Sequence, residues 1–580
     1  MLRDKTSKKR QRKCPKQVPK ASTAFMTMSD IQKTPVAIVG GGPVGLALAL
    51  FLDRYNVPSV VFNTDTETRW HPKGSTQNAR TMEHYRRLGI ASELRLLGLP
   101  ADYPGDVAYF TRFNSHELAR LKMPSAAQKA HMVATADKLD QYPEPLLRAN
   151  QMYVEAFLLD YIRKRPNITL RFGWELKSYT QHKDDVSLLA ESVADGRSES
   201  WRAQYFVGCD GGRSFVRRQL GIRYEGEDTL QQAYFGGRMY ASHIRAPTFY
   251  RDILGDRRAF QHWAVNPQSR TTLIALDGQE EFLFWMRPND PSVAPDNDAV
   301  QHAMTLCCGA DIPVEVIGTQ PWTAGIALVA ESFADGRVLL AGDAAHLFTP
   351  TGGFGMNTGI DDAANLSWKL AAMVQGWGGP NLLESYEAER LPIAVRNTGA
   401  ARELAKHIGD VGISPDMEDD SEAGAKARRE IGAYLSTFGE EFGSIGVQLG
   451  ARYDGSTIIK GDEPPPADDF AHYTPSAVPG GRAPHAWIGA GRGEGDSLFD
   501  KLGLGFTLLR LGTSAPDAAA FVHAAQSLGV PLTTLDIPDN DIRGLYEGDL
   551  VLIRPDQYVA WRGNTTDDAD AVMKTVIGNN

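Results

Sequence analysis

The segment PVAIVGGGPVGLALALFLDRYNVPSVVFN, residues 35–63, contains two β-branched runs separated by a glycine-rich turn and an apolar helical stretch. This order predicts a βαβ unit. The glycines have the GxGxxG spacing, in which a tight turn, close approach of a pyrophosphate and helix–strand packing each require a glycine. The pyrophosphate would lie at the positive N-terminus of the helix. The segment therefore predicts a dinucleotide site made by Gly40, Gly41, Gly42, Pro43, Val44 and Gly45.

The second strand of such a unit usually ends in an acidic residue that binds ribose hydroxyls. Asn63 occupies this position, and Asp65 and Glu67 are nearby substitutes. The amide oxygen of Asn63 can accept a hydrogen bond without carrying a charge. We expect Asn63 to contact the adenosine ribose.

Two later segments distinguish FAD from a nicotinamide dinucleotide, because FAD is extended and needs contacts from distant parts of a chain. They are YFVGCDGGRSFVRRQLGI, residues 205–222, and RVLLAGDAAHLFTPTGGFGMNTGIDDAANLSWKLA, residues 337–371. In the second, Asp343 ends a strand and can hold ribityl hydroxyls, and a helix begins near Asn357. The N-terminus of that helix would stabilise an anionic reduced flavin.

Together these segments resemble the class A flavoprotein aromatic hydroxylases, the family of p-hydroxybenzoate hydroxylase and phenol hydroxylase. NARTMEHYRRLGI, QMYVEAFL and YEAERLPIA add to the resemblance, which extends over most of residues 35–400. It implies an α/β fold: a Rossmann-like FAD-binding domain interleaved with a mixed-sheet substrate domain, plus a C-terminal thioredoxin-like domain.

The resemblance also implies roles for single residues. Arg80 and Gln151 would contact the ribose and pyrophosphate region, and Asp210 would serve both FAD and NAD(P)H. Pro350 would lie near the reacting carbon of the flavin. The remaining expected FAD contacts are Gly342, Asp343, Gly355, Met356 and Asn357.

The implied activity is hydroxylation of a phenolic ring through a flavin hydroperoxide, with FAD as cofactor, NADPH or NADH as cosubstrate, and molecular oxygen. The residue that assists phenol ionisation stays open, because Ser75 occupies the matching place and serine is a poor base. Other candidates are Arg238, Tyr240, His262 and Trp263, although a single His or Tyr on a strand is more often structural.

Two kinds of alternative remain. One is a flavin-dependent epoxidase or halogenase on the same fold, although the halogenase signature W-x-W-x-I-P is absent. The other is a flavin-binding regulatory protein. The glycine cluster GAGRGEG, residues 489–495, lacks dinucleotide spacing, so we expect a loop there.

The chain divides into four expected parts. Residues 1–30 would be a disordered basic tail, which is a leader or a polyanion-binding segment. Residues 31–405 would hold the FAD-binding domain, with substrate-domain insertions at about 100–150 and 222–330. A helical segment and linker, 406–470, would precede a thioredoxin-like domain, 471–580. All four cysteines lie at or before Cys308, so this last domain should be redox-silent and serve packing or homo-oligomer assembly.

Composition narrows the partners. The formal net charge of −10 argues against nucleic acid and membrane surfaces as partners of the main body. No apolar run approaches the roughly 18–20 residues that span a bilayer, so we expect a soluble, cytoplasmic protein. The cysteines show no CxxC spacing, and we expect reduced thiols and no metal site.

Overall fold

The computed structural model describes residues 31–228, 237–287, 290, 292–409, 411–461 and 463–579. The expected basic tail, residues 1–30, lies outside the described residues. Among the helices of the described ranges, none is both long and apolar enough to cross a membrane.

The first layer is a largely parallel sheet with the order β16-β17-β8-β1-β2-β5. Its strands are β1 (Ile31–Val39), β2 (Ser59–Asn63), β5 (Ile168–Phe172), β8 (Ser198–Gly208), β16 (Ala334–Asp335) and β17 (Val338–Leu340), and the hairpin β6 (Trp174–Gln181)–β7 (Val186–Ser192) extends it. Residues 36–38 and 60–62 are completely buried, as expected for strands covered on both faces.

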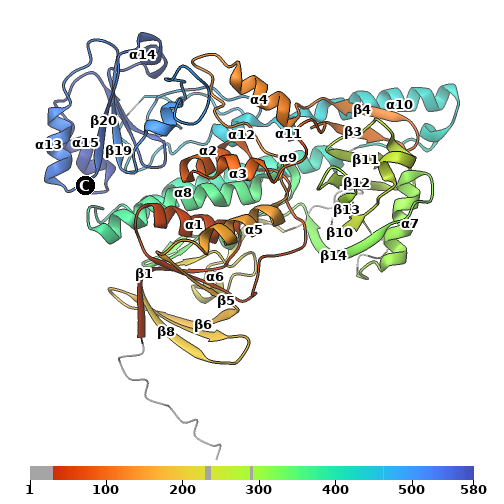
Figure 1. Ribbon diagram of the computed structural model, residues 1–580, viewed down its shortest axis with the longest axis horizontal. Helices are drawn as coiled ribbons and strands as arrows, with labels where there is room; N and C mark the ends of the chain where they lie inside the picture. The colour runs from red at the N-terminus through yellow and green to blue at the C-terminus, as the bar shows by residue number, and fades with distance from the viewer. Residues whose placement is uncertain are drawn as a thin grey trace, which may run out of the picture.

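Helices α1 (Pro43–Arg54), α5 (Gln151–Ile162) and α8 (Phe354–Gln375) pack together on one face of this sheet (Figure 1). The helix α1 follows β1 directly, with a proline at its first position, where the missing N–H costs nothing. The predicted βαβ unit is therefore confirmed at residues 31–63.

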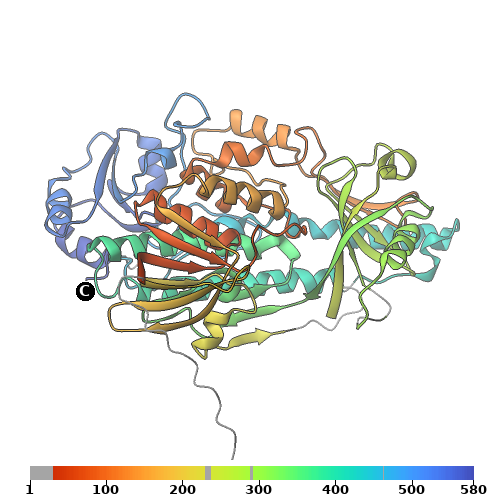
Figure 2. The same ribbon diagram turned by 60° about the horizontal axis from the view of Figure 1, so that its bottom comes forward.

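A second, mixed sheet has the order β14-β10-β13-β12-β11-β3-β4. Its strands are β3 (Val107–Phe110), β4 (Glu117–Leu121), β10 (Gly237–Arg245), β11 (Gln261–Val265), β12 (Arg270–Ala275), β13 (Glu281–Met286) and β14 (Glu315–Ala324). Strands β3 and β11 are parallel and the other pairs are antiparallel. In Figure 2 the yellow-green strands of this sheet lie to the right of the red strands of the first sheet.

Smaller elements surround these layers. They are the strands β9 (Tyr224–Glu227), β15 (Ala327–Ala330) and β18 (His346–Phe348), the helices α2 (Ala79–Leu88), α3 (Ala91–Arg95), α4 (Ala126–Ala134), α6 (Phe215–Gln219) and α7 (Asn297–Cys308), the π-helix η2 (Phe249–Leu254), and the 3-10 turns η3 (Gly342–Ala344) and η4 (Thr351–Gly353). Strands β18, β15 and β9 form a third, short sheet.

After the long helix α9 (Glu384–Gly409), the chain returns to the second sheet. It forms η5 (Pro415–Glu418), α10 (Glu422–Leu435), η6 (Ser436–Phe438), α11 (Gly439–Gly443) and α12 (Ile445–Leu449). Helix α10 packs on β4, and α11 packs on η4. This segment thus contributes to the interior between the layers and is more than a linker.

The C-terminal region forms a four-stranded sheet with the order β20-β19-β21-β22. Its elements are η7 (Leu498–Lys501), β19 (Phe506–Leu511), α13 (Ala519–Ser527), β20 (Leu532–Ile537), α14 (Asn540–Tyr546), β21 (Leu550–Ile553), β22 (Val559–Gly563) and α15 (Ala569–Val576). The Trp368 ring of α8 meets Phe506 edge-on, with centroids 5.8 Å apart. The C-terminal sheet therefore shares a continuous apolar core with the first layer.

Candidate functional site

A cavity of about 490 Å³ opens at the carboxyl ends of β1, β2, β8 and β17. Parallel sheets bind ligands at this edge. The sequence-predicted residues that line it are Gly40, Gly41, Gly42, Pro43, Val44, Asn63, Gln151, Asp210, Asp343, Pro350, Gly355 and Met356. The structure thus brings together segments that lie more than 300 residues apart in the chain.

The three motif glycines differ in what surrounds them. Gly40 has a φ of +109°, and a Cβ on it would lie 2.1 Å from the Cys209 carbonyl oxygen. A Cβ on Gly45 would lie 2.0 Å from the Gly40 carbonyl oxygen, so this position serves helix–turn packing and does not line the cavity. A Cβ on Gly42 would meet nothing within 4 Å. The space beside Gly42, at the N-terminus of α1, therefore fits a pyrophosphate.

Two polar side chains organise the edge of this cavity. The Asn63 amide oxygen accepts a hydrogen bond from the Gly41 N–H at 3.0 Å, and its Nδ2 donates to the Asp65 carbonyl at 3.0 Å. Asp210 Oδ2 accepts from the N–H groups of Phe215 and Val216, whereas its buried Oδ1 has no partner in the described part of the chain. Asp210 therefore offers an unused acceptor to a ligand hydroxyl.

The loop before α8 forms the opposite wall. Gly352 and Gly353 adopt left-handed conformations, with φ of +73° and +67°, immediately before the helix starts at Phe354. Asn357 does not line the cavity; its Nδ2 donates to the Gly353 carbonyl at 2.6 Å and its Oδ1 accepts from the Asn78 N–H at 2.9 Å. The Asn357 side chain therefore fixes this glycine loop, and the expected contact of its backbone with the flavin stays a prediction. Gly342 also lies outside the lining, because it packs against Val44.

These features fit FAD. The cavity combines a glycine turn at a helix N-terminus, the carboxyls of Asp210 and Asp343, and the backbone of Gly355 and Met356 at the start of α8. Such a donor and acceptor set suits a pyrophosphate, hydroxyls and a ring with a developing negative charge.

A second cavity, of about 870 Å³, meets the first along the loop that contains Pro350. Phe348, Pro350 and Gly353 line both cavities. Aromatic side chains dominate the wall of the second: Trp70, Phe260, Trp285, Trp322, Phe348 and Phe442. Its size and lining suit an aromatic molecule larger than a single ring.

Among the ionisable residues that line this aromatic cavity, Arg148 and Glu441 come from different parts of the chain. Burial raises the pKa of the Glu441 carboxyl to about 8, against the opposing effects of the Gly352 backbone and Arg148. Burial lowers the pKa of Arg148 to about 10. The Arg148 Nη1 donates to Thr76 Oγ1, and its guanidinium lies 4.4 Å from the centroid of the Phe260 ring.

The proposed phenol-assisting residues on the second sheet lie elsewhere. His262 is fully buried, its Nε2 accepts from the Ala259 N–H at 3.0 Å, and burial lowers its pKa to about 3. Tyr240 is 1% exposed, and Arg238 is exposed with its guanidinium 5.5 Å from the Tyr240 ring. None of these three residues lines either cavity. Ser75 does line the aromatic cavity, and its Oγ accepts from Asn150 Nδ2 at 2.9 Å.

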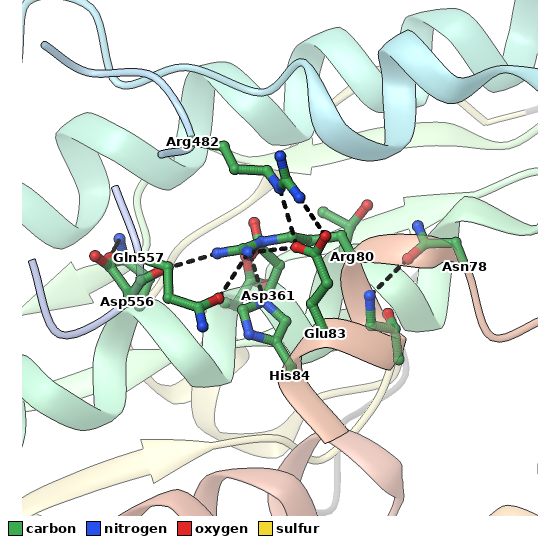
Figure 3. A network of polar contacts seen from close by, with 12 residues as sticks. Asn78, Arg80, Glu83, His84, Asp361, Arg482, Asp556 and Gln557 are labelled. Atoms are coloured by element: carbon green, nitrogen blue, oxygen red, sulfur yellow. Dashed lines mark hydrogen bonds and ion pairs between the residues drawn. The ribbon is translucent and has the colours of Figure 1, made fainter. Parts of the chain in front are cut away.

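Arg80 also lies away from the cavities, in a buried network between α2 and the C-terminal region (Figure 3). Its Nη1 donates to Glu83 at 2.8 Å and to Gln557 at 3.0 Å, and its Nη2 donates to the Asp556 carbonyl at 2.7 Å. Arg482 pairs with Glu83 from the other side. The expected FAD contact of Arg80 is therefore not seen, because its guanidinium is engaged by Glu83 of the same helix and by Asp556 and Gln557 of the C-terminal region.

Sequence reasoning missed Arg148, Glu441 and Phe442. The last two belong to a charged stretch, DMEDDSEAGAKARREIGAYLSTFGEEFG, that was interpreted as a helical segment and linker. A signal does exist, because FGEEFG places aromatic residues around two acids. By sequence alone, the FGEEFG pattern looks the same as part of an exposed charged helix, because most glutamates in such helices face water.

Comparison with protein families gives two matches. Residues 33–401 match the model described as FAD binding domain, and residues 476–579 match the one described as aromatic-ring hydroxylase, C-terminal. An FAD-dependent monooxygenase of Emericella nidulans is 32% identical, covering 97% of this chain and 93% of that protein. A phenol 2-monooxygenase of a Pseudomonas species is 29% identical, covering 93% of this chain and 91% of its own length.

Solved structures of related proteins have the same fold as this chain. RebC with bound 7-carboxy-K252c superposes with a TM-score of 0.84 at 34% identity, covering 95% of this chain and all of that one. The likeness therefore spans both sheets, the intervening helical segment and the C-terminal region.

Proposed function

The chain belongs to the FAD-dependent aromatic-ring hydroxylases, and we propose that it uses NADH or NADPH and molecular oxygen to hydroxylate a phenolic, polycyclic substrate. The coarser activity, that of an FAD-dependent monooxygenase, follows from membership. The electron donor and the phenolic substrate are the proposal.

One observation carries the proposal: the cavity that fits FAD meets an aromatic-lined cavity at the loop of Pro350. When bound, FAD supplies the redox and oxygen chemistry. The chain positions the substrate ring beside it with Trp285, Trp322 and Phe348, and the apolar walls exclude bulk water. The volume of about 870 Å³ favours several fused rings over a single phenol.

The relatives support both parts of the proposal. One is named for phenol, and another was solved with the large ligand 7-carboxy-K252c. The glycine cluster at residues 489–495 forms a loop and lacks the features of a second dinucleotide site, which supports one cleft that serves both FAD and the electron donor. Those glycines fold around Asp496, whose Oδ2 accepts from the Gly493 N–H at 3.1 Å, and they open no long helix.

The proposal is tested with purified holoenzyme. Denatured protein should release FAD, and oxidation of NADH or NADPH should accelerate when hydroxylated anthraquinones or naphthols are added, with products heavier by one oxygen. Non-hydroxylatable analogues should yield hydrogen peroxide instead. Oxidation that ignores every phenol but responds to an alkene or a halide would favour an epoxidase or halogenase. Absence of any turnover with bound FAD would favour a regulatory flavoprotein.

A further inference from the structure

Two ionisable side chains that line the aromatic cavity each have a buried polar atom without a partner among the described residues. Glu441 Oε2 and Arg148 Nη2 have no hydrogen-bonding partner within the described part of the chain, although both residues line the cavity. The Glu441 residue is only 8% exposed. Leaving such a buried group unpaired is unfavourable, and more so when the group is charged. The two atoms are therefore suited to bind a ligand, Glu441 Oε2 as a hydrogen-bond acceptor when ionised and Arg148 Nη2 as a donor.

Their surroundings fix both side chains. Arg148 is held by its bond to Thr76 and by the Phe260 ring, which leaves Nη2 as the free end of the guanidinium. Glu441 lies on α11, which packs on η4, and the Gly352 backbone is a hydrogen-bonding neighbour of its carboxyl. Gly352 is two residues from Pro350, where the two cavities meet. Glu441 is thus a buried carboxyl that reaches the aromatic cavity close to the junction with the flavin cleft, where Asp65 and the exposed Glu67 also lie.

Resting on the proposed function, we propose that Glu441 is the catalytic residue that takes the proton of the substrate hydroxyl, and that Arg148 holds the resulting phenolate oxygen. The phenol O–H bond breaks and an O–H bond forms at Glu441 Oε2. The electron pair stays on the phenolate oxygen, so the negative charge passes from the carboxylate to the substrate. Arg148 Nη2 then donates a charge-assisted hydrogen bond to that oxygen. The proton step needs no further reactant.

Other ionisable or hydroxyl groups on this wall fit the role less well. His71 Nε2 is engaged with the Ala241 carbonyl at 3.1 Å, and Ser75 Oγ accepts from Asn150. Glu67 forms an exposed ion pair with Arg163. Burial makes the ionised Glu441 carboxylate a stronger base than an ordinary carboxylate or imidazole, although Arg148 opposes part of this effect, and that strength suits a phenol.

The charges around Glu441 define the expected pH response. Burial raises its pKa to about 8, and Arg148 is the charged side chain that opposes this. Two short 3-10 turns pack on α11: η6, with the sequence STF, and η4, with the sequence TGG. Neither turn carries a titratable side chain. The base form therefore accumulates as the pH rises through about 8. The rate constant kcat/KM should increase over the same range, because the ionised carboxylate is the active form.

The test compares Glu441→Gln, Glu441→Asp and Arg148→Met with the control Glu430→Gln, a glutamate of α10 that is 69% exposed. Each holoenzyme is first checked for FAD content. In the substrate assay, Glu441→Gln should lose the rise in kcat/KM near pH 8 and about 10²–10⁴-fold in rate, the typical contribution of a general base. Glu441→Asp should keep a pH-dependent rise at reduced rate. A Glu441→Gln enzyme that matches Glu430→Gln in rate and pH profile overturns the proposal.

A binding readout separates this proposal from the proposed function. The dye 4-nitrophenol absorbs visible light only as its phenolate, so the pH at which the bound dye ionises can be titrated without turnover. Arg148→Met should raise that pH by at least about one unit, a tenfold change in equilibrium. If the bound dye ionises at the same pH in Arg148→Met and Glu441→Gln as in wild type, the roles proposed for both residues are wrong. If the pH shifts but phenols do not stimulate turnover, only the proposed hydroxylase function is wrong.

Discussion

Replacing Arg482 with methionine should destabilise the protein far more than loss of an ordinary surface charge. Arg482 is 1% exposed, donates from Nε to Glu83 Oε2 at 3.0 Å, and reaches Tyr473 Oη and the Gln141 carbonyl, each at 3.2 Å. Methionine keeps most of the volume but leaves the Glu83 carboxylate buried with Arg80 as its remaining cation. Breaking one side of a buried ion pair costs about 3–5 kcal/mol.

The protonation of Glu83 determines how the stability contributed by this ion pair changes with pH. Burial alone would raise its pKa, but Arg482 and Arg80 hold it below the usual 4.5. The pair therefore contributes stability above pH 4.5, and this contribution is lost as the pH falls through the lower folded value. The penalty of Arg482→Met should accordingly shrink in acid, where Glu83 becomes protonated.

Urea denaturation followed by tryptophan fluorescence at pH 7 and at pH 4, below the ordinary Glu83 value of 4.5, measures this penalty in holoenzyme. Lys574→Met is the matched control, because its pair with Asp570 is exposed and should be worth less than about 1 kcal/mol. The double change Arg482→Met with Glu83→Gln should recover part of the loss, because no carboxylate is then buried without Arg482 and Arg80 keeps Asp361 at 3.6 Å. A cost for Arg482→Met no larger than that for Lys574→Met would refute the reasoning.

Four further outcomes are expected. Gly42→Val should fold but bind no FAD, because its side chain enters the open space of the cleft; unchanged FAD content would argue against a pyrophosphate there. Asp343→Ala should weaken FAD retention while the melting temperature of apoprotein stays within a few degrees of wild type. Deleting the chain from residue 471 onward should cause aggregation, since Trp368 and the Glu389 carboxylate lose Phe506 and Arg554; a soluble truncated protein would contradict this. Glu441→Gln should raise the free energy of unfolding more at pH 9 than at pH 5, by up to a few kcal/mol, since the raised pKa makes ionisation of Glu441 destabilising between 4.5 and about 8.

The cofactor side of the site was accessible from sequence because its requirements are local. A glycine turn, a strand end and a helix start each leave a pattern within a few residues, so Gly42, Asp210 and Asp343 were found and lie in one cavity. Asn357 and Gly45 were found too, but they support the cavity from behind. Spacing alone does not distinguish a glycine that leaves room for a ligand, such as Gly42, from one that allows close packing of a helix, such as Gly45.

The substrate side was not accessible in this way. His262 and Tyr240 sit on strands whose alternation predicts two faces but not which face borders a cavity. Their side chains are buried within the second sheet. Glu441 and Arg148 meet across almost 300 residues, and Arg80 finds its partners at Asp556 and Gln557 in the C-terminal region. Such pairings are set by tertiary packing, for which a single sequence carries no periodic signal.

The position of α11 and α12 in the chain has a practical consequence. Glu441, Phe442 and Gln448 border the aromatic cavity, yet they lie between the two matched family regions, which end at residue 401 and resume at residue 476. These three residues are a small part of a wall whose other residues come from the FAD-binding region and the second sheet. If the proposed substrate cavity is correct, exchanging residues 411–461 between relatives should alter the cavity on one side only, while the glycines and carboxylates of the FAD cleft stay unchanged.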